Sequence, residues 1–159
     1  MFESVVKRYF SRELDTRTKE LGLKRWYIAY YCEISEGCLV ECLRGERLPT
    51  VWQLILMAEM CNCTVNDLLG YRYFRGDTDK IASSIPQAKR RLAENMWNRI
   101  NDLLFDRHMD YHRLSERIGI SSMTVDSWFK TGSSTYPKTI VFLRICDALD
   151  CTPSELLGY

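Results

Sequence analysis

The two halves of this chain end in the same pattern. Residues 48–71 reappear 88 positions later as residues 136–159, and both copies close on Leu-Leu-Gly-Tyr. A repeat at this spacing predicts two similar units of roughly 70 residues each, instead of one larger core. Units of this size fold alone when they are helical and well packed.

The chain contains enough hydrophobic residues for two cores. Its charged residues are unevenly distributed. Hydrophobic residues make up 46% of the 159 residues, far above the level of a disordered chain. Residues 12–70 hold 7 basic and 9 acidic side chains, and so do residues 92–159. The rest of the chain holds 8 basic and 3 acidic side chains, so the surplus positive charge lies in the N-terminal arm and between the units. Such a basic linker either lies along phosphates or is solvated.

The sequence indicates a cytoplasmic protein. It has neither a signal-peptide pattern nor an apolar run of about 18 residues, so we expect no membrane span. Its seven cysteines are an odd number and form no disulfide framework, which suits a reducing compartment.

Apolar spacings of three and four residues predict helices and almost no strand. In the first half the predicted helices cover residues 2–21 (as one helix or two), 24–32, 36–43, 50–61 and a short stretch after Thr64. In the second half they begin at or next to Ser84, Asp110, Ser122, Lys138 and Thr152. Helix caps are predicted at Ser35, at Asp110, at Thr64 with Asp67, and at Thr152 with Glu155.

We therefore expect an all-α protein of two tandem five-helix domains. The first covers residues 1–70 and includes an extra N-terminal helix. The second covers residues 86–159, and a basic linker of residues 71–85 joins the two.

Each half also carries two helices separated by a tight turn, with the same residue types around it. A small residue lies in the first of these helices, an apolar residue and a serine end the turn, and an apolar residue follows four positions after the serine. These residues are Ala29, Ile34, Ser35 and Leu39 in the first half and Ser115, Ile120, Ser121 and Val125 in the second. Both segments resemble the helix-turn-helix of the phage-repressor/Cro family, also called XRE-like.

The resemblance implies a sequence-specific transcriptional regulator, repressor-like and of bacterial or phage type, that binds double-stranded DNA. In that family the helix after the turn enters the major groove, and its early residues meet base edges. The base-facing residues would be Ser122, Met123, Thr124 and Ser127 in the second copy and Glu36, Gly37, Cys38 and Glu41 in the first. The phosphate contacts would be Arg25, Arg44, Arg47, Tyr111, Lys130 and Lys138.

The first copy departs from the family's pattern where DNA would be read. Glu36 and Glu41 on a groove-facing helix repel phosphates, whereas arginine, asparagine and glutamine are the usual readers of bases. Gly37 contributes no side chain. If only one copy reads DNA, we therefore expect it to be the second.

The alternative is a protein-binding module derived from a helix-turn-helix, such as a phage-encoded inhibitor, adaptor or dimerisation protein, with little DNA reading by the first domain. It is favoured by the acidic helix and by the aromatic side chains of Tyr27, Tyr30 and Tyr31. A homodimer or a protein partner would then use the first domain.

The sequence predicts no cofactor, no metal site and no catalysis. Six cysteines fall where the family places core residues, and paired Cys-x-x-Cys spacing is absent. These six are Cys32, Cys42, Cys61, Cys63, Cys146 and Cys151, which leaves Cys38 as the one expected to be exposed. His108 and His112 lie near Asp106 and Asp110 without a third ligand, and we expect them to be solvated.

Two further sets of apolar side chains have predicted positions. Trp26, Trp52, Trp97 and Trp128 fit core or interface positions, and Trp26 is available for packing from the helix of residues 24–32. The N-terminal stripe of Phe2, Val6, Tyr9 and Phe10 exceeds what a helix-turn-helix needs. It either packs over the first domain or forms a dimer contact.

Overall fold

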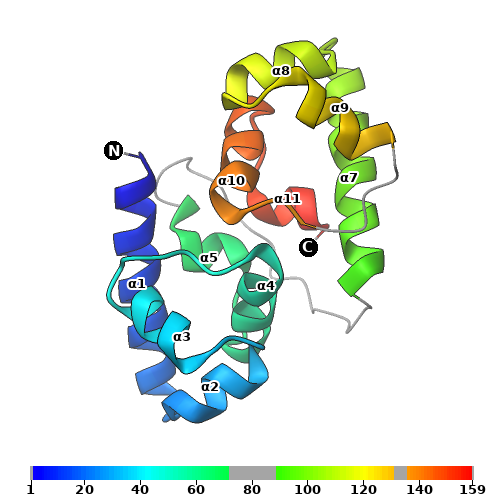
Figure 1. Cartoon of the computed structure of the whole chain (residues 1–159). Helices are drawn as coiled ribbons and strands as arrows, with labels where there is room; N and C mark the ends of the chain where they lie inside the picture. Colours follow the sequence, from blue (N-terminus) through cyan, green and yellow to red (C-terminus); the bar gives the residue numbers. More distant parts are fainter. Residues whose placement is uncertain (1, 72–88, 131–135, 159) are drawn as a thin grey trace. The chain divides into compact units, whose positions relative to one another are not determined.

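The computed structural model describes residues 2–71, 89–130 and 136–158, which form helices and connecting turns with no strand in these ranges (Figure 1). For residues 89–91 and 130 only the backbone is described. The chain divides into two units, residues 1–84 (unit 1) and 85–159 (unit 2). The predicted linker after Tyr71 and the helix start predicted at Ser84 lie outside the described residues. Within the described ranges, no helix has both the length and the apolar character that a membrane span requires.

Unit 1 consists of five described helices around one core. They are α1 (Phe2–Glu20), α2 (Arg25–Tyr31), α3 (Glu36–Leu43), α4 (Val51–Met60) and α5 (Val65–Leu69). Helix α1 is a single helix that packs along α3 and α5 (Figure 1). It buries Val6, Phe10 and Leu14 completely, so the N-terminal apolar stripe packs within the unit, while Phe2 at its start stays exposed.

A glycine lets α1 lie close to the end of α5. Gly70 ends α5 with a φ of 74°, a left-handed conformation that suits glycine. A Cβ atom at this position would lie 2.7 Å from Cδ1 of Tyr9 on α1. The Tyr9 ring therefore fills the space that any other residue at position 70 would need.

Unit 2 contains a second set of five described helices. They are α7 (Lys89–Asp106), α8 (Tyr111–Ile118), α9 (Ser122–Lys130), α10 (Thr139–Ala148) and α11 (Pro153–Leu157). Helix α7 packs against α11, and α10 packs against both α8 and α11 (Figure 1). Fully buried apolar side chains from these helices form the core, among them Met96, Ile100, Leu114, Phe142 and Leu156.

The helices of unit 2 follow those of unit 1 at a nearly constant spacing. Helices α4 and α10 begin 88 positions apart, as do α5 and α11. Helices α2 and α8 begin 86 positions apart, as do α3 and α9. Asn62 and Asp150, also 88 apart, both adopt a positive φ just before the last short helix.

The predicted helix caps are confirmed. The side chains of Ser35 and Asp110 accept hydrogen bonds from the backbone N–H groups of Cys38 and Arg113. Thr64 with Asp67, and Thr152 with Glu155, form complete capping boxes. These local hydrogen bonds explain why the helices begin where the sequence predicts.

Trp26, predicted at a core or an interface position, does not pack in the core: its side chain is 62% exposed, because it lies on the face of α2 opposite Ile28 and Ala29. Two predictions about burial are wrong. Cys63 is half-buried instead of buried, because it lies in the turn before α5. Cys38 is half-buried instead of exposed, because the guanidinium of Arg47 lies against its sulfur.

Candidate nucleic-acid interface

In unit 2, helices α8 and α9 form a helix-turn-helix. Gly119 ends α8 in a left-handed conformation with a φ of 73°, and the Ser121 hydroxyl then accepts a hydrogen bond from the backbone N–H of Thr124. Ile118 and Val125 are buried on either side of the turn. Val125 is the predicted anchor after the serine, whereas Ile120, the predicted apolar residue of the turn, is half-buried. The turn is therefore fixed by its backbone and by apolar side chains on both sides.

Ser115 is the small residue that the sequence predicts in the first helix of the pair. Its side chain is buried, and its hydroxyl donates to the His112 carbonyl at 2.5 Å. The hydroxyl is thus satisfied within α8 and leaves room for α9.

An aromatic cluster holds the C-terminal half of α9. The Trp97 ring on α7 lies 5.4 Å from the Trp128 ring and 5.3 Å from the Phe129 ring, measured between centroids. The Phe129 ring also stacks on Tyr111 of α8, with centroids 4.3 Å apart and an interplanar angle of 3°. Because α9 is held from two helices, its opposite face is presented in one orientation.

Helix α9 also carries four predicted base-facing residues, of which Met123 and Ser127 lie on the side opposite the aromatic cluster and Ser122 and Thr124 lie in the first turn. Ser122, Met123, Thr124 and Ser127 are all exposed, and Met123 is 83% exposed. None of the four is charged. The Ser127 hydroxyl donates to the Thr124 carbonyl at 2.6 Å, and the Thr124 hydroxyl shares a hydrogen bond with Ser121 at 2.8 Å. These residues therefore present hydroxyl oxygens as acceptors together with apolar groups, which can meet base edges and thymine methyls.

The predicted phosphate contacts of unit 2 differ in exposure and in their existing hydrogen bonds. Lys138 is exposed immediately before α10. The Tyr111 hydroxyl donates to Oδ1 of Asn101 at 2.8 Å, so a phosphate contact would have to break that bond. The side chain of Lys130 lies outside the described residues. Sequence reasoning missed Arg113, which is exposed in the first turn of α8, where such helices cross the DNA backbone. Arg113 follows the predicted Asp110 cap by three residues, and this spacing alone places it in the first turn of the helix.

In unit 1, helices α2 and α3 form the corresponding pair, with a different turn. Glu33 takes the left-handed position with a φ of 52°. Two residues of α4 hold it there: the Trp52 indole N–H donates to its carboxylate at 2.9 Å, and the Gln53 amide donates to its carbonyl at 3.1 Å. The turn thus rests on contacts with α4 instead of on a glycine.

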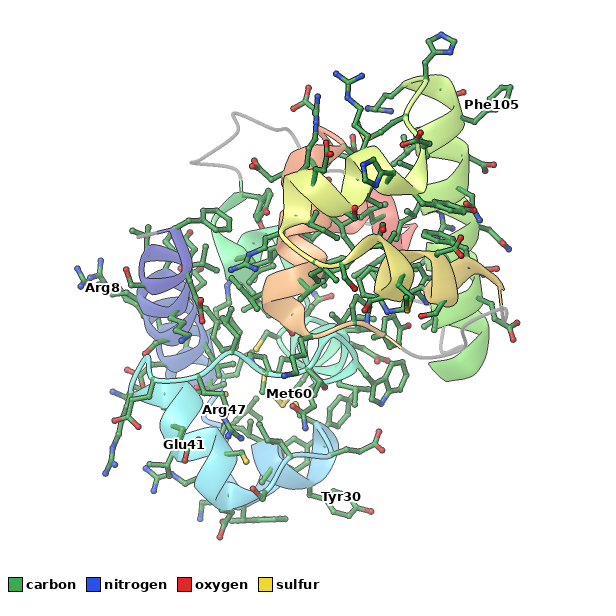
Figure 2. The ribbon with its side chains drawn as sticks, turned by 45° about the horizontal axis from the view of Figure 1, so that its top comes forward. Arg8, Tyr30, Glu41, Arg47, Met60 and Phe105 are labelled. Carbon is green, nitrogen blue, oxygen red and sulfur yellow. The ribbon has the colours of Figure 1, made fainter. Side chains whose placement is uncertain are left out.

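The outer face of α3 is occupied by an internal ion pair. Nε of Arg47 lies 3.0 Å from a Glu41 carboxylate oxygen, and Nη1 of Arg47 donates to Sγ of Cys38 at 2.8 Å (Figure 2). Arg47, a predicted phosphate contact, therefore neutralises a predicted base-facing glutamate. Glu36 and Gly37 remain exposed at the start of the helix. The other two predicted phosphate contacts of this unit, Arg25 and Arg44, are also exposed.

Burial controls the chemistry of four thiols in unit 1. Desolvation raises the pKa of Cys32 and Cys63 to about 12 and the pKa of Cys42 and Cys61 to about 11. These thiols are therefore protonated at neutral pH, whereas metal ligation and nucleophilic attack need the thiolate. Among the described residues, no three His, Cys, Asp or Glu side chains group as metal ligands. Exposed His112 instead pairs with Glu116, with Nε2 3.1 Å from the carboxylate.

Part of unit 2 matches a known protein family. Residues 99–159 match the family of Cro/C1-type helix-turn-helix DNA-binding domains. The match runs from within α7 to the end of the chain, so this part of unit 2 is similar to one Cro/C1-type domain, a kind of domain that implies DNA binding. Unit 1 lies outside the match. Comparisons with curated proteins and with solved structures gave no match.

Proposed function

We propose that the protein is a sequence-specific DNA-binding transcriptional regulator, repressor-like and of bacterial or phage type, whose second unit reads the major groove through α9. The observation that carries the proposal is the exposed, uncharged face of Ser122, Met123, Thr124 and Ser127 on a helix held by buried anchors. Its position in a Cro/C1-type domain supports the same role. Lys138 and Arg113 supply the backbone contacts that set the register of the helix on the duplex.

We further propose that the chain holds two tandem helix-turn-helix domains, residues 1–70 and 86–159. The support is the sequence repeat, the matching order and spacing of the helices, and the capping boxes at Thr64 and Thr152. The two copies differ at their outer faces, since α3 presents glutamates where α9 presents hydroxyls. Two copies on one chain need not share one function.

The second candidate function, protein binding, belongs to unit 1. The base-facing positions of α3 hold no basic residue, the nearby Arg47 is paired with Glu41, and Glu36 adds an exposed carboxylate. A surface of this kind is repelled by phosphates. Exposed aromatic side chains on α2 give the same unit a surface suited to a protein partner.

In-vitro selection of duplexes from a random library tests the main proposal. We expect the full chain to enrich one short motif, present once or as two identical half-sites. Two different half-sites would overturn the assignment of reading to unit 2 alone. The absence of any enrichment would overturn sequence-specific reading and leave protein binding as the function.

A further inference from the structure

Three aromatic side chains project from one face of α2 into solvent. Tyr30 is 82% exposed, Trp26 is 62% exposed, and Tyr27 is also exposed; Figure 2 shows Tyr30 pointing away from unit 1. The opposite face of α2 carries the buried Ile28 and Ala29. Water-exposed aromatic groups gathered on one helix face indicate a surface that another molecule covers.

These rings support one another. The Trp26 ring meets Tyr27 edge to face at 6.0 Å, and the Tyr27 ring lies 6.1 Å from Tyr31. The pKa of Tyr31 is raised, mainly by burial of its side chain and next by the nearby Glu59 carboxylate on α4. Tyr31 thus holds the Tyr27 end of the aromatic face against α4.

The charges around this aromatic face differ between its two ends. Lys24 and Arg25 are exposed at the start of α2, whereas Glu33 is exposed just after its end. A partner that matches this order carries its negative end opposite Lys24 and its positive end opposite Glu33. A second α2 running antiparallel has this order, and such a contact closes on itself about a two-fold axis.

We propose that two copies of this chain dimerise through the α2 faces of unit 1, packed antiparallel. Trp26 and Tyr30 of each copy pack against the aromatic face of the other, and Lys24 of each copy faces Glu33 of its partner copy. The inference rests on the proposed function in one respect: with DNA reading assigned to unit 2, unit 1 is free for a second copy. The dimer would bring two α9 helices to one DNA molecule and raise their effective concentration.

The dimer is tested on the full chain without DNA, so its failure is separate from a failure of DNA reading. Sedimentation equilibrium over a range of concentrations should show a monomer–dimer equilibrium. Tyr30→Ala should weaken the dimer roughly tenfold, the effect of losing a central aromatic anchor. Phe105→Ala is the matched control, because Phe105 is equally exposed, at 82%, but lies on α7 of unit 2 (Figure 2); it should leave the dimer unchanged.

A charge exchange tests the antiparallel arrangement. Lys24→Glu and Glu33→Lys should each weaken self-association, because each places like charges at both ends of the contact. An equimolar mixture of the two variants should restore it, since both end pairs are again opposite in sign. Thermal melting checks that Glu33→Lys is folded, because the Glu33 carboxylate also accepts from Trp52. A monomeric wild-type chain, equal effects of Tyr30→Ala and Phe105→Ala, or a mixture that stays monomeric would each overturn the proposal.

Discussion

At the scale of single residues, the two units form the same kind of turn with different residues. The turn needs a left-handed residue, which is Gly119 in unit 2 and Glu33 in unit 1. A side chain in this conformation costs about 1–2 kcal/mol relative to glycine. In unit 1 the hydrogen bonds from Trp52 and Gln53 offset this cost.

Two glycine substitutions should therefore change stability in opposite directions. A Cβ atom would meet nothing within 4 Å at either Gly119 or Gly37. Gly119→Ala should lower the free energy of unfolding by about 1 kcal/mol, because only its backbone is strained. Gly37→Ala, within α3, should raise it by up to about 1 kcal/mol through helix propensity. Urea unfolding measures both, and changes of the same sign would contradict the assigned backbone conformations.

The buried thiols give unit 1 a dependence on alkaline pH. The pKa of Cys63 is about 12 in the folded state against an ordinary value of 9.0, so the folded state holds the proton more tightly. The stabilisation is complete below pH 9 and is lost as the pH rises toward 12. The free energy of unfolding should fall over this range, and Cys63→Ser should make the fall shallower. An identical slope in the variant would show that Cys63 ionises equally in both states.

At the scale of elements, the sequence predicts the helices well because their ends are set locally. Ser35, Asp110 and the two threonine capping boxes act within four residues of themselves, so their signals can be read directly. Contacts between helices and loops cannot be read from the sequence in this way. The pairing of Arg47 with Glu41 depends on how the loop after α3 packs against that helix. The stacking of Tyr111 on Phe129 depends on how α8 and α9 pack against each other. No local pattern specifies this packing.

Tyr111 illustrates how the structure changes the expected role of a residue. Tyr111→Phe keeps the ring that stacks on Phe129 but removes the hydrogen bond to Asn101. It should lower the free energy of unfolding by about 1 kcal/mol and leave DNA affinity nearly unchanged. Arg113→Ala should lower DNA affinity and leave the free energy of unfolding nearly unchanged. A large loss of affinity in Tyr111→Phe, measured by fluorescence anisotropy on a selected duplex, would restore Tyr111 as a phosphate contact.

At the scale of the whole molecule, the two units share an order of helices but present different surfaces. DNA binding through unit 2 should weaken steeply with salt, because each phosphate contact releases counterions. Lys138→Ala should reduce the slope of log K against log salt by about 1. Arg47→Ala should leave the slope unchanged, since Arg47 is already paired with Glu41. Equal changes in both variants would place unit 1 on the phosphates as well.

The affinity of one pair of variants for a selected duplex tests the division of labour most directly. Ser127→Glu places a carboxylate on the exposed face of α9 and should weaken binding by roughly 100-fold or more, because like charges are brought together. Glu41→Ala removes a carboxylate from α3 and should leave the affinity unchanged or slightly higher. Circular dichroism checks that both variants keep their helices. Unchanged affinity in Ser127→Glu, or a large loss in Glu41→Ala, would contradict the assignment of DNA reading to α9 of unit 2.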